Sequence, residues 1–196
     1  MIIVGLTGGI GAGKTYVANE FQKLNIPVYN SDIRAKELMI SDKFIKENLI
    51  KKFGEDVFVN KSLNKKLIAD KIFNNTDLKT WIDNLVHPFV RKDFLQWVSN
   101  QKTFMVIKEA AILIESSAYK DCDKIIVVTA PLDIKISRVI KRDGATEQDV
   151  MQRIKNQMQD DERLKYADYV IENYGLASVT KQVVDIYYKL SEIKNR

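Results

Sequence analysis

Eight consecutive residues carry the strongest chemical signal in this chain. Residues 8–15 read Gly-Gly-Ile-Gly-Ala-Gly-Lys-Thr, which matches the phosphate-binding pattern Gly-x-x-x-x-Gly-Lys-Ser/Thr. Such a loop surrounds a polyanion with backbone N–H groups, and its glycines permit close approach. We expect Lys14 to reach the β- and γ-phosphates of a nucleotide and the Thr15 hydroxyl to coordinate Mg²⁺. The pattern therefore indicates nucleotide binding without specifying the reaction.

The residues on either side of this loop are those that would position it. Apolar residues 2–6 precede it and predict a buried strand, whereas residues 16–21 follow it and predict the start of a helix. Strand, glycine turn and helix are the context in which the motif binds phosphate. The N-terminus of the helix also directs the positive end of its dipole toward the anion.

The wider pattern predicts an α/β protein with a parallel sheet covered on both faces. Apolar stretches without polar alternation are typical of such buried strands, and helical stretches separate them. The predicted strands are 2–6, 27–29, 104–107, 125–128 and 169–171. The predicted helices are 14–24, 42–52 with Asp42 as cap, 65–73 with Asn64 as cap, 77–85, 89–98, 131–142, one opening at the capping box 146–149, and 177–190.

Two helical blocks extend this core. Residues 33–101 are almost wholly helical and too long for an ordinary crossover, which predicts an insertion over the carboxyl edge of the sheet, where open α/β folds bind ligands. Residues 141–166 are helical and highly charged, as expected of a small lid. The prolines 27, 88 and 131 are each expected at an element boundary.

Composition limits the classes of function. The 196 residues are 45% hydrophobic and 29% charged, which predicts one ordinary domain with a proper core. We expect neither a membrane span nor a signal peptide. The single cysteine, Cys122, fits a cytoplasmic protein, and its acidic neighbours predict an unreactive thiol. The net charge of +5 suits a polyanionic ligand, and without a basic run or aromatic RNA-binding signature we expect a small phosphorylated molecule, not nucleic acid.

The residues outside the loop favour a kinase over a nucleotide switch. The GTPase patterns Asp-x-x-Gly and Asn-Lys-x-Asp do not occur in the chain. A kinase needs a carboxylate near the acceptor hydroxyl, cations near the transferred group and a cover against water. Asp32 directly follows the second predicted strand and is the best such carboxylate; the alternative is an N-cap for a helix starting at Ile33.

Other charged residues allow two interpretations each. Arg138 and Arg142 are four residues apart on one helix, so they either stabilise phosphoryl charge or form surface pairs, for example with Asp143. The only histidine, His87, is expected to have a structural or substrate-contacting role. Glu109 and Glu115 flank an apolar patch after a strand, and either lies near the metal or caps a helix.

Several separated motifs together resemble the dephospho-CoA kinase family. The resemblance spans residues 2 to about 190, and the order and intervals of the motifs make it specific. The motifs are Gly5–Lys14, Val17-Ala18, Leu24–Val28, Asp32, Leu85–Pro88, Leu113–Glu115, Arg142–Gly144, Gln157-Met158, Glu162–Leu164 and Ala167–Ile171.

The resemblance implies a P-loop NTPase-type sheet with a helical substrate-binding insertion and a lid. It implies phosphorylation of the ribose 3′-hydroxyl of dephospho-CoA by ATP with Mg²⁺, giving CoA and ADP. It places residues 11–16 (Gly11, Ala12, Gly13, Lys14, Thr15 and Tyr16) at the ATP phosphates, Asp32 as the base, Arg142 in the lid and Asn173 at adenine. Lys36, His87 and Arg138, with Asp32, are the expected contacts to dephospho-CoA.

Some positions depart from the family pattern. Asn30-Ser31-Asp32 stands where the family commonly has Asp-Ala-Asp, and Lys36 stands where it often has Arg. Two other functions stay open: a nucleoside or nucleotide kinase with another acceptor, and a non-catalytic nucleotide-dependent RNA-binding protein. We expect a monomer, although the sequence leaves an oligomer open.

Overall fold

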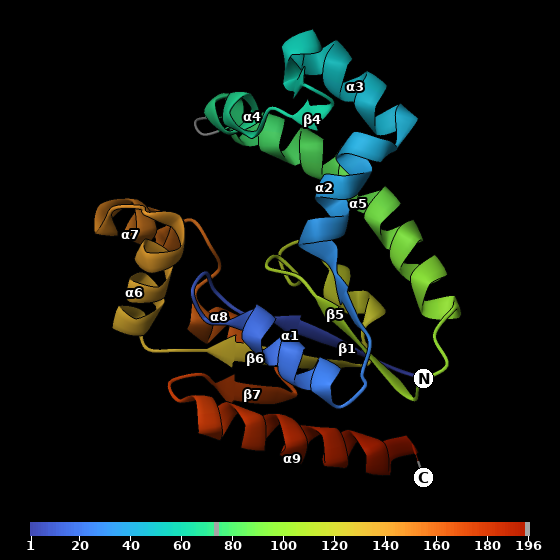
Figure 1. The fold of residues 1–196 in the computed structure, drawn as a ribbon, viewed down its shortest axis with the longest axis vertical. Helices are drawn as coiled ribbons and strands as arrows, with labels where there is room; N and C mark the ends of the chain where they lie inside the picture. The colour runs from blue at the N-terminus through green and yellow to red at the C-terminus, as the bar shows by residue number, and fades with distance from the viewer. Residues whose placement is uncertain (73–74, 195–196) are drawn as a thin grey trace. The chain divides into compact units, whose positions relative to one another are not determined.

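The computed structural model describes residues 1–72 and 75–194. The chain forms two compact units, shown in Figure 1. The core unit comprises Met1–Asn30 and Gln101–Arg196, and the insertion unit comprises Ser31–Asn100. Each unit is described separately.

A five-stranded parallel sheet forms the centre of the core unit, in the order β2-β5-β1-β6-β7. Its strands are β1 (Ile2–Thr7), β2 (Val28–Asn30), β5 (Met105–Glu109), β6 (Lys124–Thr129) and β7 (Tyr169–Glu172). The central strand β1 pairs with β5 from Ile2 opposite Met105 and with β6 from Val4 opposite Lys124. All five predicted strands are confirmed, and each extends one or two residues beyond its predicted carboxyl end.

Helices cover one face of this sheet. Helices α1 (Lys14–Lys23) and α9 (Leu176–Lys194) pack on it, and Figure 1 shows α9 lying alongside β7. Phe21 of α1 and Leu190 of α9 are completely buried in the same apolar cluster as Leu6 of β1. The opposite face carries a second cluster around Leu113 and Val127, next to the short 3-10 helix η2 (Ala118–Asp121). The expected α/β architecture, covered on both faces, is confirmed.

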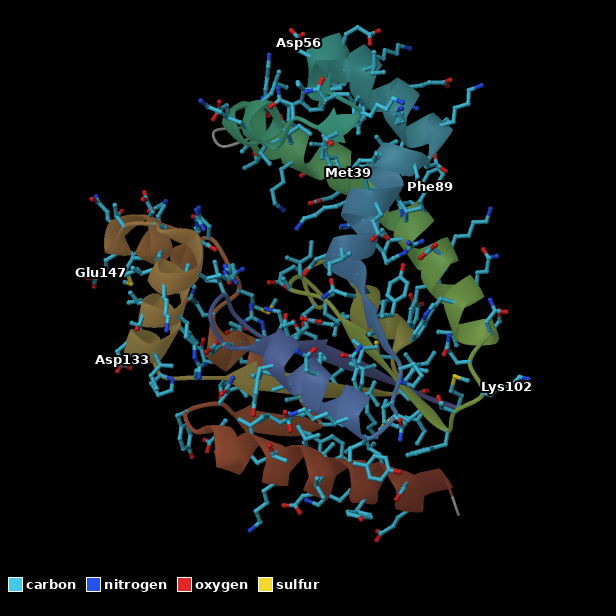
Figure 2. The ribbon with its side chains drawn as sticks, viewed as in Figure 1. Met39, Asp56, Phe89, Lys102, Asp133 and Glu147 are labelled. Atoms are coloured by element: carbon cyan, nitrogen blue, oxygen red, sulfur yellow. The ribbon has the colours of Figure 1, made fainter. Side chains whose placement is uncertain are left out.

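Three helices follow one another in the chain between β6 and β7. They are α6 (Leu132–Asp143), α7 (Glu147–Lys155) and α8 (Asp160–Leu164). Figure 2 labels Asp133 and Glu147 in the first turns of α6 and α7. Thr146 and Asp149 form the predicted capping box, because each side chain binds the backbone N–H of the other residue. The role of this segment as a lid stays a prediction.

The insertion unit is mostly helical. It contains α2 (Ser31–Ser41), α3 (Lys43–Phe53), the 3-10 helix η1 (Glu55–Val57), α4 (Lys65–Ile72) and α5 (Thr76–Ser99). Asp42 caps α3 by accepting the N–H of Ile45, and Asn64 caps α4 by accepting that of Leu67, as predicted. The predicted end of α4 at Phe73 lies outside the described residues. Figure 2 labels Met39 of α2 and Phe89 of α5; Met39 is buried, and Phe89 stacks on Phe44.

A small hairpin interrupts this helical unit and was not predicted. Strands β3 (Phe58–Val59) and β4 (Ser62–Leu63) pair in antiparallel fashion. The turn between them consists of Asn60 and Lys61, which both have positive φ angles, 49° and 63°. Two-residue hairpin turns require such angles, and Lys is not one of the residues that usually signal them.

The prediction that Pro88 separates two helices was wrong. Helix α5 continues from Thr76 to Ser99 with Pro88 inside it. An interior proline costs about 3 kcal/mol because it lacks the N–H and clashes with the preceding turn. Val86 on one side and Val90 and Phe94 on the other are buried, so packing on both sides of the proline offsets that cost.

Within residues 1–72 and 75–194, no helix combines the length and apolar character that crossing a membrane requires.

Candidate nucleotide-binding site

The glycine-rich loop connects β1 to α1, as the sequence predicts, and two of its glycines are required by their surroundings. Gly11 and Gly13 have φ angles of 78° and 91°, in the left-handed region that favours glycine. A Cβ atom on Gly13 would lie 2.1 Å from Nδ2 of Asn173, and one on Gly11 would lie 2.5 Å from the carbonyl oxygen of Lys135. Neither position therefore accepts a side chain without movement of its neighbours.

The catalytic candidate Lys14 lies against its own loop. Its ammonium group donates to the carbonyl oxygens of Gly8 at 2.9 Å and Gly9 at 3.4 Å. These contacts hold a positive charge over the loop, where the phosphates of a nucleotide are expected. Tyr16, the last residue predicted at the phosphates, packs its ring against the apolar core cluster of the sheet.

Thr15 lies next to a carboxylate from another strand. Its hydroxyl donates to Oε1 of Glu109 at 3.0 Å, and the Asn30 side-chain amide donates to Oε2 of Glu109 at 2.8 Å. Glu109 is the last residue of β5 and is only 4% exposed. The carboxyl ends of the adjacent parallel strands β1, β5 and β2 bring the three side chains together.

This arrangement fits a hard divalent cation. Hydroxyl and carboxylate oxygens are the ligands that Mg²⁺ uses in proteins, usually only one or two of them together with water and phosphate oxygens. Thr15 and Glu109 supply one of each. Of the two glutamates considered from sequence, Glu109 is thus the one beside the predicted metal ligand, whereas Glu115 lies beside Arg163.

Arg138 and Asn173, which lie outside the loop, form hydrogen bonds to its carbonyl oxygens. The Asn173 amide nitrogen donates to the carbonyl oxygen of Ala12 at 2.9 Å, and Nη1 of Arg138 donates to those of Gly11 and Ala12 at 3.3 and 3.4 Å. Nη2 of Arg138 also donates to the Asn173 side-chain oxygen at 3.1 Å. Both polar ends of this 2%-exposed asparagine therefore bind the protein. Its expected contact with adenine stays a prediction, as does the expected contact of Arg138 with dephospho-CoA.

Arg142 lies at the end of α6 and is paired on the protein surface. It donates two hydrogen bonds to Asp143, at 2.7 and 3.0 Å, and Arg153 of α7 donates to the same carboxylate at 2.9 Å. Hydrogen bonding to Arg142 is the main reason that the pKa of Asp143 lies below its usual value, and Arg153 contributes less. The surface pairing with Asp143 that the sequence left open is therefore present. It does not test a catalytic role of Arg142.

Sequence reasoning missed a contact between the predicted lid and the loop. The side-chain oxygen of Gln157, between α7 and α8, accepts the backbone N–H of Ile10 at 2.8 Å. Gln157-Met158 belongs to the motifs of the family resemblance, but spacing alone gives it no partner 147 residues away.

The remaining predicted residues belong to the insertion unit. Helix α2 begins at Ser31, so the alternative that Asp32 is the N-cap of a helix starting at Ile33 was wrong; Asp32 lies inside the first turn. Lys36 is exposed on the same helix. His87 of α5 lies with Nε2 3.7 Å from Oδ1 of Asp83, and its side chain is 38% exposed. The proposed functional roles of these three residues stay predictions.

An ion pair fixes the helix that carries Asp32. Arg34 of α2 donates from Nε and Nη2 to the two carboxylate oxygens of Asp93 in α5, at 3.0 and 2.6 Å. Such a two-point contact restricts orientation as well as distance. Asp32 and Lys36 are therefore carried by a helix whose position within the insertion unit is well defined.

Comparisons with known proteins agree on one family. A model of the family described as dephospho-CoA kinase matches residues 2–178. A dephospho-CoA kinase of Bacteroides fragilis is 37% identical over 186 residues, which covers 94% of this chain and 91% of the relative. The crystal structure of TT1252 from Thermus thermophilus superposes with a TM-score of 0.85 at 27% identity, over 96% of both chains. A dephospho-CoA kinase from Campylobacter jejuni has the same fold, with a TM-score of 0.72 at 22% identity over 98% of both chains.

Proposed function

This chain belongs to the dephospho-CoA kinase family, and from that premise we propose that it transfers the γ-phosphoryl group of ATP to the ribose 3′-hydroxyl of dephospho-CoA. The products are CoA and ADP, as in the final step of coenzyme A biosynthesis. The observation that carries the proposal is the family match over residues 2–178, which includes the complete phosphate-binding loop and the expected acceptor residues. Other nucleotide kinases share the loop, so the loop alone would not identify the acceptor.

The residues that bind ATP in this proposal belong to the core unit. The backbone N–H groups of residues 11–15 and the N-terminus of α1 bind the phosphates, and Lys14 exchanges its contacts with the carbonyls of Gly8 and Gly9 for phosphate oxygens. Arg138 and Asn173 keep the loop in shape through the carbonyls of Gly11 and Ala12. We assign Arg138 primarily to this support, because its guanidinium donates to the carbonyl oxygens of Gly11 and Ala12 and to the side-chain oxygen of Asn173.

Mg²⁺ belongs to the proposed site as the partner of ATP. Thr15 would hold it through its hydroxyl, and the carboxylate of Glu109 would hold it directly or through water. When bound, the ion neutralises charge on the β- and γ-phosphates. Asn30, through its hydrogen bond to Glu109, keeps that carboxylate oriented toward Thr15.

The residues that contact dephospho-CoA and activate its hydroxyl in this proposal belong to the insertion unit. Asp32 orients the ribose hydroxyl and takes its proton, while Lys36 and His87 contact dephospho-CoA. The hydroxyl oxygen then forms a bond to the γ-phosphorus, and the bond from that phosphorus to the bridging oxygen of ADP breaks. Arg142 moves from its pair with Asp143 to stabilise the charge on the transferred group. We further propose that the enzyme is a cytoplasmic monomer that does not act on nucleic acid.

The test is ADP release from Mg-ATP with and without dephospho-CoA, with the mass of the product determined. We expect strong stimulation and a gain of one phosphoryl group. Lys14→Met is the control, because it removes the charge over the loop while keeping a long side chain. Equal or greater stimulation by adenosine or a nucleoside monophosphate would replace the proposed acceptor, and salt-sensitive RNA binding without any acceptor would favour a binding protein.

A further inference from the structure

Residues 157–163, which run from the turn between α7 and α8 into α8, lie against the phosphate-binding loop. Gln157 accepts the Ile10 N–H through Oε1 at 2.8 Å. A Cβ atom built on the neighbouring Gly9 would lie 3.4 Å from Oδ1 of Asp160, 3.7 Å from Nη1 of Arg163 and 3.9 Å from Oε1 of Gln157. Three side chains of one short segment thus lie against the first half of the loop.

A buried ionic cluster fixes this segment. The side chain of Arg163 is completely buried, and it donates to Asp160 at 3.0 Å and to Glu115 at 3.4 Å. Asp160 also pairs with Lys135 of α6. A buried guanidinium is strongly unfavourable unless its charge is compensated, so separating Arg163 from these carboxylates would cost far more than breaking a surface pair. The cluster therefore anchors α8 to the rest of the core unit.

The turn that carries Gln157 has local support as well. The side-chain nitrogen of Gln159 donates to the carbonyl oxygens of Gln157 at 2.9 Å and Ile154 at 3.3 Å. The Arg163 N–H donates to the carbonyl oxygen of Gln159 at 3.0 Å, which begins α8. Gln157 is consequently held between a helix end and an anchored helix, in a defined position opposite Ile10.

We infer that Gln157 is a positioning residue for ATP, which sets the conformation of the loop through the Ile10 N–H and links the 157–163 segment to the phosphate site. This inference rests on the proposed function. The amide is suited to the task because its oxygen accepts the N–H without placing a full negative charge beside the phosphates, as a carboxylate would. Any displacement of the segment then changes the loop directly.

Two substitutions separate the hydrogen bond from the charge. Gln157→Met keeps the length of the side chain and removes the acceptor, whereas Gln157→Glu keeps an acceptor and adds a negative charge. Gln152→Met is the matched control, because Gln152 is an exposed glutamine on the preceding helix α7. Hydrogen exchange of the Ile10 amide in the nucleotide-free protein reports the contact, and the KM values for ATP and dephospho-CoA, with kcat, report its consequence.

We expect Q157M to exchange the Ile10 amide about tenfold faster than wild type and to raise the KM for ATP by about the same factor. The KM for dephospho-CoA and the exchange of β1 amides should not change. Q157E should retain slow Ile10 exchange but bind ATP more weakly, and Q152M should match wild type in all measurements.

Wild-type exchange at Ile10 in Q157M would overturn the inference. A rise at Ile10 matched by an equal rise throughout β1 would also overturn it, because it would report general destabilisation. Loss of slow Ile10 exchange in Q157E would do the same, since the acceptor is still present. The exchange measurement needs no substrate, so it stands even if the wild-type protein phosphorylates another acceptor.

Discussion

The hydroxyl of Thr15 lies 3.0 Å from the carboxylate of Glu109, although 94 residues separate the two in the chain. One follows the loop after β1, and the other ends the neighbouring strand β5. Their meeting places a hydroxyl and a buried carboxylate at the start of α1, where the helix dipole and Lys14 supply positive charge. The pair therefore combines anion-binding and cation-binding groups at one point.

Glu109→Gln should weaken the contribution of Mg²⁺ to ATP binding. The amide keeps the shape of the side chain and removes its charge, and comparable losses around metal sites reduce metal affinity by about 10- to 100-fold. Calorimetric titration of ATP with and without Mg²⁺ measures the effect. ATP binding without the metal should be unchanged or slightly tighter, and the exposed Glu162→Gln should behave as wild type. An unaltered Mg²⁺ dependence would contradict the assignment of Glu109.

Gly13→Ala should destabilise the protein and weaken nucleotide binding. Its Cβ would clash with the Asn173 amide nitrogen at 2.1 Å, in addition to the strain of a positive φ angle, about 1–3 kcal/mol. Gly144→Ala is the matched control, because Gly144 also has a positive φ angle, 65°, but nothing lies within 4 Å of its Cβ position. Urea unfolding compares the two. Equal losses of unfolding free energy would mean that the clash with Asn173 contributes nothing.

Asp32→Ala should abolish most turnover while ATP affinity stays near the wild-type value. A positioned proton acceptor contributes about 10²- to 10⁴-fold to a rate. Single-turnover kinetics with saturating dephospho-CoA, together with ATP titration, separate the two effects. Asp70→Ala, an exposed carboxylate on α4, is the control for altered charge in the insertion unit. Full turnover in the Asp32 variant would show that another group activates the acceptor.

Asp143→Asn should lower stability in a pH-dependent manner. Because the folded-state pKa of Asp143 is lowered by Arg142 and Arg153, its stabilising effect is present above the unfolded pKa and is lost as the pH falls through the folded one. The difference in unfolding free energy from wild type should be below about 1 kcal/mol at neutral pH, since the group is largely solvated. This difference in unfolding free energy should become smaller as the pH is lowered. A constant difference down to low pH would mean that the carboxylate charge is not responsible.

Cys122 should resist thiol reagents until the protein unfolds. Burial raises the pKa of this thiol to about 12, with smaller contributions from Asp121 and Asp123, so the thiolate is scarce at neutral pH. Labelling with iodoacetamide over a urea series, read by mass spectrometry, should follow the unfolding transition. Rapid labelling in native buffer would show that the site opens locally.

The strands and the loop were predictable because their signals are local. The apolar run before Gly8 and the glycine pattern itself specify a strand and a turn without reference to the rest of the chain. For Cys122 the sequence shows the acidic neighbours, which raise the pKa of the thiol less than burial does, and burial depends on tertiary packing. The proline inside α5 was misread for the same reason, since buried residues on both sides outweigh a local rule.

The contacts that hold the site residues in place were harder to predict, because they join residues that are far apart in the sequence. Glu109 is one of two glutamates near a strand end, and only the register of β5 against β1 selects it. Arg138 and Arg142 share a helix and a residue type, but one reaches the loop and the other pairs with its own neighbour. The two arginines share a face of α6 but lie one turn apart, and the partner that tertiary structure brings to each turn, which sequence spacing does not fix, separates these two outcomes.

The strand order also has a consequence for synthesis on the ribosome. Among the described residues, the strands that pair with β1 are β5 and β6, and the strand that pairs with β2 is β5, so neither β1 nor β2 finds its partner until residues beyond 104 have emerged. Throughout that interval the apolar β1 segment is exposed beside the growing insertion, whose contacts are local and form faster. A nascent chain stalled before β5 should therefore attract chaperones through its exposed β1 segment.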